Sequence, residues 1–322
     1  MTTSTGADAC PACGEPAVGA ASWCEACGAD LDGPAPSPPC ADCGAPGEGI
    51  VDGYCGSCGA RQPGEHDHVV VDLGWVAAVT HKGSRRAGNE DAFSVTDANG
   101  TAVIAVCDGV GSTDSPAAAA RAAATAASDA LSDDLRAVAV VADVDLTKAA
   151  AAAQHQVIAI TQADPPRAGD LPPSATLVVA VARADSDGVS GVVGWLGDSR
   201  AYWVGAEALR LTADHVYDGP PGDEQSGSIT RWLGLDAADV TPSSVDFRAQ
   251  APGLLIVCTD GLWRYLDEPQ ALAATVARLR TDNPQPVQLA QALVDYANSS
   301  GGHDNITVAI AEFGPNPGGD AT

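Results

Sequence analysis

Positive charge is scarce in this sequence. Its 322 residues include only 16 Lys and Arg against 42 Asp and Glu, which gives a formal net charge of −26. A chain this acidic repels nucleic acid and anionic membrane surfaces, so we expect neither as a partner. No run of about 18 apolar residues occurs, and the first ten residues lack the basic and apolar regions of a secretory signal. We therefore expect a cytoplasmic protein.

Large apolar side chains are nearly missing from the first sixty residues, although hydrophobic residues make up 45% of the whole chain. This segment is rich in Gly, Pro and Ala and cannot build a hydrophobic core of its own. β-Like runs begin only at Val69, after a polar segment. The sequence thus predicts an N-terminal module over 1–60, a linker over 61–68, a globular domain over 69–313 and a disordered tail over 314–322.

Eight of the ten cysteines lie in the N-terminal module, in four Cys-x-x-Cys pairs that are each followed by glycine. Two pairs fall within 10–27 and two within 40–58. In a reducing compartment this spacing favours two structural zinc sites over reduced or disulfide-bonded thiols. The predicted zinc ligands are Cys10, Cys13, Cys24, Cys27, Cys40, Cys43, Cys55 and Cys58. Because residues 1–60 contain neither Lys nor Arg, we expect these zinc ribbons to bind a protein rather than nucleic acid.

The domain that follows alternates pairs of β-like runs with pairs of helical segments. The predicted helices cover 115–135, 146–161, 270–280 and 287–297, and the predicted strands include 93–96, 102–107, 176–181, 192–196, 254–258 and 306–310. Consecutive strands followed by paired helices favour antiparallel sheets covered by helices over a parallel βαβ sheet. The expected fold class is therefore α+β.

A tight hairpin is predicted where Asn99-Gly100 lies between two β-like runs. Closing this hairpin would bring Asp91 and Asp108 to the same open end of the two strands. Each acidic residue alone is compatible with an ordinary turn beside a strand.

A second pair of acidic residues repeats this arrangement. Asp260 follows the run 254–258 and Asp304 precedes the run 306–310, so antiparallel pairing would bring these two together as well. Carboxylates gathered in this way repel one another unless cations lie among them, and hard oxygen ligands suit Mg²⁺ or Mn²⁺. Two such metals favour the hydrolysis of a phosphoester.

These residues lie within seven motifs whose order resembles that of the metal-dependent, type-2C protein phosphatases. The motifs are Arg86–Asp91 (RAGNED), Asp108-Gly109, Gly197–Arg200 (GDSR), Leu211–His215 (LTADH), Ile229–Gly234 (ITRWLG), Thr259–Trp263 (TDGLW) and His303–Thr307 (HDNIT). The resemblance implies a four-layer αββα sandwich, in which two antiparallel sheets flanked by helix pairs hold a dimetal centre at one end. It also implies a serine/threonine phosphoprotein phosphatase of bacterial type, whose substrates are proteins phosphorylated by Ser/Thr kinases.

The resemblance further assigns roles to the residues that match. Asp108 would bridge the two Mg²⁺ or Mn²⁺ ions and take part in catalysis, and Gly109 would offer its carbonyl oxygen. Asp260 and Asp304 would hold the first metal. A water or hydroxide that bridges the metals would attack the phosphorus atom.

Three more residues complete the implied site. Glu90 and Asp91 would hold waters on the second metal, and Arg86 would bind the phosphate, for which its planar fork is suited. Asp170 is a candidate ligand for a third metal. Because Val110 stands where some relatives have histidine, no general acid is assigned.

Two other functions stay open at this point. The first is a catalytically weak, phosphatase-like sensor or scaffold that acts through its zinc ribbons. The second is a dimetal hydrolase of small phosphoesters, which would share the metal chemistry and differ only in surface recognition. Several carboxylates retained together favour an active enzyme over the first alternative.

Overall fold

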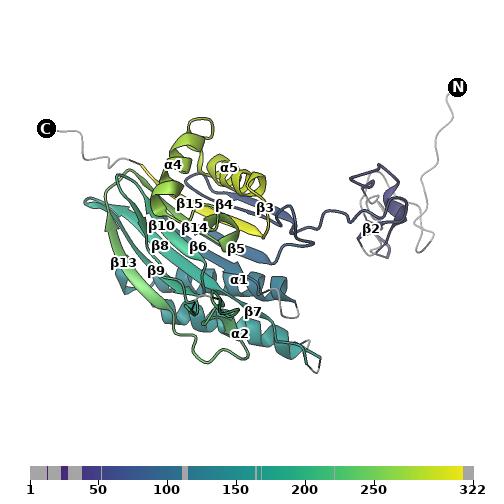
Figure 1. Cartoon of the computed structure of the whole chain (residues 1–322), viewed down its shortest axis with the longest axis horizontal. Helices are drawn as coiled ribbons and strands as arrows, with labels where there is room; N and C mark the ends of the chain where they lie inside the picture. The colour runs from purple at the N-terminus through teal and green to yellow at the C-terminus, as the bar shows by residue number, and fades with distance from the viewer. Residues whose placement is uncertain are drawn as a thin grey trace. The chain divides into compact units, whose positions relative to one another are not determined.

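The computed structural model describes residues 13, 23–27, 38–51, 53–110, 115–163, 165–167, 169–220 and 222–314. The chain divides into two compact units, Met1–Gly64 and Glu65–Thr322, of which the larger holds the sheets and long helices drawn in Figure 1. No helix in the described part of the chain has the length and apolar character needed to cross a lipid bilayer.

Two antiparallel sheets form the centre of the larger unit. The first sheet has six strands in the order β11 (Ala208–Arg210), β10 (Arg200–Val204), β14 (Gly253–Cys258), β15 (Ile306–Phe313), β4 (Val76–His81) and β3 (His68–Asp72). The second has five strands in the order β13 (Ser243–Ala249), β9 (Gly188–Leu196), β8 (Leu177–Asp185), β6 (Thr101–Asp108) and β5 (Asp91–Asp97). A short antiparallel pair, β7 (Ser174–Ala175) and β12 (Leu233–Gly234), lies outside both sheets.

Each sheet is covered on its outer face by two helices (Figure 1). The five-stranded sheet carries α1 (Pro116–Leu135) and α2 (Leu146–Ala163), and the six-stranded sheet carries α4 (Pro269–Arg280) and α5 (Pro286–Ser299). A one-turn helix, α3 (Asp260–Trp263), follows β14. Proline begins α1, α4 and α5, at a position where its missing N–H costs no helical hydrogen bond. The expected α+β class and four-layer αββα sandwich are confirmed.

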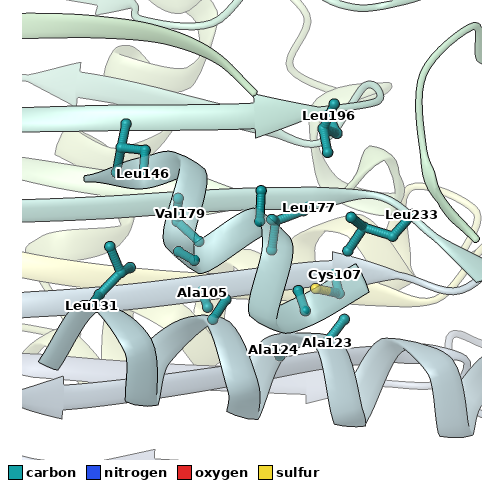
Figure 2. Packing of buried hydrophobic residues seen from close by; sticks show 14 of the residues in the cluster. Ala105, Cys107, Ala123, Ala124, Leu131, Leu146, Leu177, Val179, Leu196 and Leu233 are labelled. Carbon is teal, nitrogen blue, oxygen red and sulfur yellow. The ribbon is translucent and has the colours of Figure 1, made fainter. Parts of the chain in front are cut away.

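Alanine allows α1 to lie close to its sheet. Five alanines share one fully buried face of the helix, namely Ala119, Ala120, Ala123, Ala124 and Ala127. Figure 2 shows Ala123, Ala124 and Cys107 of β6 within one apolar cluster. The opposite face of β6 packs in a second cluster between the two sheets. Strand β6 is therefore held on both faces, which fixes the position of Asp108 at its end.

The β5–β6 hairpin forms as the sequence predicts. Asn99 and Gly100 occupy its turn with φ of 55° and 79°, the left-handed values that a two-residue hairpin turn requires. The side chain of Asp97 accepts a hydrogen bond from the Gly100 N–H at 2.7 Å. In the resulting register Asp91 lies directly opposite Asp108.

Some strands differ from the sequence prediction. The β-like run that begins at Val69 forms a hairpin of β3 and β4, because Gly74 turns the chain with φ of 84°. Strands β10, β11 and β13 were not predicted. Residues of β13 alternate between half-buried and exposed at the edge of a sheet, so their apolar signal is weak.

Candidate metal centres

Asp91 joins the two sheets at the end where the strands carry acidic residues. Only 3% of its surface is exposed. Its Oδ2 accepts hydrogen bonds from Thr259 Oγ1 at 2.7 Å and Thr307 Oγ1 at 2.8 Å. Both threonines belong to the β14–β15 side of the molecule, whereas Asp91 begins β5. These bonds bring the end of the β5–β6 hairpin against the ends of β14 and β15.

Asp260 and Asp304 lie at the same end of the six-stranded sheet. Asp260 begins α3 directly after β14, and Asp304 precedes β15, with Cys258 and Val308 paired between the strands. Their charges interact with each other and with those of Asp91 and Asp108. We call Asp91, Asp108, Asp260 and Asp304 the acidic cluster. The structure thus brings together the four carboxylates that the strand pattern selects.

Burial and mutual repulsion raise the pKa values of three members of the acidic cluster, Asp91, Asp108 and Asp260. Burial is the main cause: it raises the pKa of Asp91 to about 8 and that of Asp260 to about 7, and neighbouring carboxylates add to it. The pKa of Asp108 lies well above its usual range for the same reasons. A site that disfavours its own negative charge in this way is suited to bind a cation.

Unpartnered oxygen atoms support this interpretation. Among the described residues, the buried side-chain oxygens without a hydrogen-bond partner are Asp91 Oδ1, Asp198 Oδ1 and Asp260 Oδ1. Buried polar atoms normally have partners, so three orphaned carboxylate oxygens in one region fit ligands of a hard cation such as Mg²⁺ or Mn²⁺. The carboxylates lie farther apart than the thiols of the N-terminal unit. Among the described residues, groups of three or more ligand atoms that all lie within 4.8 Å of one another consist of cysteines alone.

Glu90 and Gly109 lie beside the acidic cluster on adjoining backbone. The Gly109 N–H donates to the Glu90 carbonyl at 3.1 Å. Asn305 Oδ1 accepts from the Glu90 N–H at 2.9 Å, which fixes this segment to the start of β15. A Cβ atom at Gly109 would lie 2.6 Å from the Pro116 carbonyl oxygen, so only glycine fits. Burial raises the pKa of Glu90 as well.

Thr176 holds the backbone of Asp108 in place. Its Oγ1 accepts the Asp108 N–H at 3.0 Å, and its own N–H donates to the Asp108 carbonyl at 2.8 Å. The same hydroxyl is 2.9 Å from Ser199 Oγ in the GDSR motif. Thr176 and Ser199 thus position the central carboxylate, a role that the motifs alone did not reveal.

Arg86 lies at the open side of the acidic cluster. Its guanidinium donates to Asp304 Oδ2 at 2.7 Å, while 45% of its side chain remains exposed. The bond to Asp304 is the main reason that the pKa of Arg86 is raised. A charged guanidinium at the entrance of the site is placed to meet an anionic substrate.

Asp198 belongs to the GDSR motif, for which the sequence analysis gave no site role. A structural role would be the simplest interpretation of this motif. That interpretation fits Arg200, which is buried and bonds to Asp214 and Asp267. Asp198, however, is buried with an unpartnered oxygen, and its charge adds to the raised pKa values of Asp108 and Asp260. The signal that could have found it is an aspartate just beyond the buried strand β9.

Asp170 is not part of the acidic cluster. It is exposed in the connection between α2 and β7, and its backbone N–H donates to the Arg167 carbonyl at 3.0 Å. Within the described residues, no hydrogen bond or ion pair joins its carboxylate to the acidic cluster.

Two histidines near the motifs make hydrogen bonds that support the fold. His215 contacts Ser243 Oγ at 2.9 Å, and His81 accepts a hydrogen bond from the Gly83 N–H at 2.9 Å.

In the N-terminal unit, Cys40, Cys43, Cys55 and Cys58 form one tetrad. The Sγ–Sγ distances Cys40–Cys58 and Cys43–Cys55 are both 3.7 Å. This is far longer than the 2.05 Å or so of a disulfide, and it matches the separation of about 3.8 Å that four bonds of about 2.3 Å to a tetrahedral zinc would give. The Cys43 N–H donates to Cys40 Sγ and is the main cause that lowers the pKa of Cys40 to about 6.

Cys13, Cys24 and Cys27 form a second group, in which Cys13 and Cys24 have their sulfurs 3.6 Å apart. The fourth predicted ligand, Cys10, lies outside the described residues.

Gln62 lies beyond residue 60, where the predicted module ends, and it still contacts the tetrad of Cys40, Cys43, Cys55 and Cys58. Its Nε2 donates to Cys40 Sγ at 3.2 Å, and its Oε1 accepts a hydrogen bond from the Ala41 N–H.

A protein-family model described as protein phosphatase 2C matches residues 80–296. This region includes all but one of the motifs named above, and Asp304 lies just beyond it. No protein with a curated description is significantly similar to the sequence.

Solved bacterial structures share the fold. The serine/threonine phosphatase PstP/Ppp of Mycobacterium tuberculosis is 23% identical, with a TM-score of 0.59 over 76% of this chain and 100% of its own. Stp1 of Staphylococcus aureus is 21% identical, with a TM-score of 0.58 over 78% of this chain and 99% of its own. The catalytic domain of PstP in complex with two manganese ions is 24% identical, with a TM-score of 0.56 over 74% of this chain and 96% of its own.

Proposed function

Because this chain belongs to the protein phosphatase 2C family of metal-dependent protein-serine/threonine phosphatases, we propose that its acidic cluster holds two Mg²⁺ or Mn²⁺ ions and hydrolyses phosphoserine and phosphothreonine esters. The observation that carries this proposal is the convergence of buried, unpartnered carboxylate oxygens, two of which belong to Asp91, at the start of β5, and Asp260, at the start of α3. The manganese-bound PstP structure, which has the same fold, supports the choice of metal.

The proposed ligands follow the positions of their strands. Asp108 would bridge the two ions, Gly109 would offer its carbonyl oxygen, and Asp260 and Asp304 would hold the first ion. When bound, two such ions supply an activated water for attack on phosphorus and positive charge for the transition state. The hydrogen bonds from Thr176 keep Asp108 oriented for this role.

Glu90 and Asp91 would act on the second ion through waters. The two threonine hydroxyls occupy Asp91 Oδ2 and leave Oδ1 available toward the site. For a third ion, the buried and unpartnered Oδ1 of Asp198 supports this residue as a ligand more strongly than it does the exposed Asp170.

Arg86 would bind the phosphoryl group. Its bond to Asp304 holds the guanidinium over the site, and its exposed part is free to receive two oxygens of a phosphate. Substrates are then phosphorylated proteins, the products of Ser/Thr kinases. Because Arg86 is partly exposed, a phosphoryl group on the surface of a protein can reach it. This position favours a phosphoprotein substrate over a small phosphoester that would be enclosed by the site.

The cysteine groups would each bind one structural Zn²⁺, with Cys10 as the fourth ligand of the first site. The tetrad distances support this assignment for Cys40, Cys43, Cys55 and Cys58. The ribbons would serve to bind a protein partner, since they carry no Lys or Arg that would attract nucleic acid.

The test is manganese-dependent hydrolysis of a phosphothreonine peptide by the full chain, with total metal content measured on the same samples. Asp260→Asn should lower kcat/KM by about 100-fold or more, because a direct ligand matters at least as much as its supporting partners. Asp246→Asn, an exposed aspartate on β13, is the matched control and should remain active. A wild-type protein that keeps two zincs but hydrolyses no phosphoester would instead support the scaffold function.

A further inference from the structure

A hollow opens beside the acidic cluster, with a volume of about 400 Å³. Its walls are mainly apolar and come from three segments of the chain: Val110, Leu171 with Ser174, and Ser228 and Ile229 with Trp232 and Asp236. We call it the Trp232 pocket. Leu171 is 51% exposed and neighbouring Leu235 is 54% exposed, so this region presents apolar surface to solvent. Apolar surface of this kind next to a catalytic centre is typical of a binding site.

One wall of the Trp232 pocket is formed by residues next to Asp108 in the chain. Val110 follows Gly109 directly, and its N–H donates to the Ser174 carbonyl at 3.1 Å. Gly109 pairs with Ala175 in an isolated bridge, and the next residue along, Thr176, binds the Asp108 backbone. Only Gly109 separates Val110 from Asp108, so the Cα atoms of these two residues are at most about 7 Å apart. The pocket therefore lies within reach of any peptide whose phosphate enters the acidic cluster.

The walls of the pocket are fixed before a ligand binds. Leu233 and Gly234 pair with β7, and the Gln154 side chain of α2 both donates to the Gly234 carbonyl at 2.7 Å and accepts from its N–H at 2.8 Å. Trp232 Nε1 donates to Asp236 Oδ1 at 2.9 Å, which orients the indole. A preformed apolar pocket binds a side chain without first ordering its own walls.

We infer that the Trp232 pocket is a substrate subsite that takes one large apolar side chain, such as Leu, Ile, Met or Phe, from the phosphoprotein. An extended peptide advances about 3.3 Å per residue. The side chain that reaches the pocket therefore lies two or three residues from the phosphorylated residue. The inference rests on the proposed function, because it takes the acidic cluster as the place where the phosphate binds.

Other hollows are less suited to this role. One of them, of about 710 Å³, lies beside α4 and is lined by residues that include Val204, Gly253 and Phe313. These residues occupy the ends of β10, β14 and β15 that are opposite to the acidic cluster. A substrate whose phosphate is at the cluster would have to span the length of the sheet to reach it.

The experiment uses the full chain with Mn²⁺ and phosphothreonine peptides in which each flanking position, in turn, is Leu or Ser. In the wild type we expect Leu at one position, two or three residues from the phosphothreonine, to raise kcat/KM about tenfold, the usual range for apolar pockets. Leu171→Ser and Ile229→Ser should bring this Leu-to-Ser ratio close to one. Leu209→Ser, which alters an equally exposed leucine on β11, should keep the wild-type ratio.

p-Nitrophenyl phosphate separates failure of the subsite from failure of the function. If the wild type hydrolyses this small ester but shows the same kcat/KM for Leu and Ser at every position, the subsite is refuted while the phosphatase function stands. A Leu preference that survives both pocket substitutions also refutes it. If no phosphoester is hydrolysed, the proposed function falls and the subsite falls with it.

Discussion

The two kinds of candidate metal site in this protein are built in opposite ways. The cysteine tetrad is local, since Cys40 and Cys58, its first and last ligands, are 18 residues apart. The acidic cluster depends on distant segments, because the hydrogen bond that fixes Asp91 comes from Thr307, 216 residues away. A small module with little core requires its metal to fold, whereas a large core holds carboxylates together against their repulsion. The predictions below test this difference.

Zinc removal should have the largest effect and should separate the two units. A structural zinc contributes about 10–16 kcal/mol to such modules. We expect a strong chelator to give disordered NMR signals for residues 38–62 of the full chain and leave signals of the larger unit dispersed. Cys40→Ser should act in the same way, whereas Ser57→Ala, an exposed change in the same module, should not. Dispersed ribbon signals without zinc would contradict the comparison.

The acidic cluster should instead depend on its protein surroundings. Buried Arg200 bonds to Asp214 at 2.7 Å and to Asp267 at 2.7 Å, and its guanidinium carbon is 3.6 Å from the centroid of the Trp263 ring in α3. Arg200→Met should lower the free energy of unfolding by about 3–5 kcal/mol, because it leaves the largely buried Asp214 carboxylate with only the guanidinium of Arg210, 3.9 Å away. Chemical denaturation measures this loss.

The same substitution should weaken Mn²⁺ binding, since α3 begins with Asp260. Arg248→Met is the control, because Arg248 is largely exposed and pairs only with exposed or half-buried aspartates. A loss of stability no greater in Arg200→Met than in Arg248→Met would mean that the GDSR arginine does not support the cluster.

The difference between sites built from nearby residues and sites built from distant segments also explains which site residues could be predicted from the sequence. The candidate thiol ligands follow from spacing alone, and Asn99-Gly100 was enough to place Asp91 opposite Asp108. Asp198 was not found, because its part in the site depends on how β9 ends relative to β6, which no local pattern records.

The residues that support the site could not be predicted from the sequence either. Thr259 and Thr307 bind Asp91 only because two sheets meet at their ends. The Trp232 pocket combines Val110 with Leu171 and Ile229, which are far apart in the chain. Packing between layers determines such neighbours, and hydrophobic periodicity identifies the layers without fixing how their ends align.

Proton binding should reveal the strain in the acidic cluster. Because the folded pKa of Asp91 is about 8 and that of Asp260 about 7, above their values in an unfolded chain, the folded state holds protons that the unfolded state releases. This stabilisation is complete below about pH 4 and is lost as pH rises through 7 to 8. Without added Mg²⁺ or Mn²⁺, the full chain should therefore melt at a lower temperature at pH 9 than at pH 7.

The shift in melting temperature should amount to several degrees, as about 1–2 kcal/mol would give for a domain of this size. Asp91→Asn should reduce this pH dependence, because the amide does not titrate, and Asp246→Asn should preserve it. A melting temperature that rises from pH 7 to pH 9 would contradict the raised pKa values.

Arginine near the acidic cluster should have the smallest effect. Arg264 donates to Asp260 Oδ2 at 2.7 Å from a side chain that is 59% exposed, whereas the first sixty residues offer the thiolates no arginine or lysine at all. A guanidinium on a metal ligand competes with the cation for the same oxygen. Arg264→Gln should therefore tighten Mn²⁺ binding by about fivefold, the factor that corresponds to ~1 kcal/mol for an exposed pair. Calorimetric titration measures this change, with Arg278→Gln on α4 as the control. Weaker Mn²⁺ binding in Arg264→Gln would contradict this expectation. It would show that Arg264 orients Asp260 for the metal instead of competing with the metal, and that the cluster depends on Arg264 as we expect it to depend on Arg200.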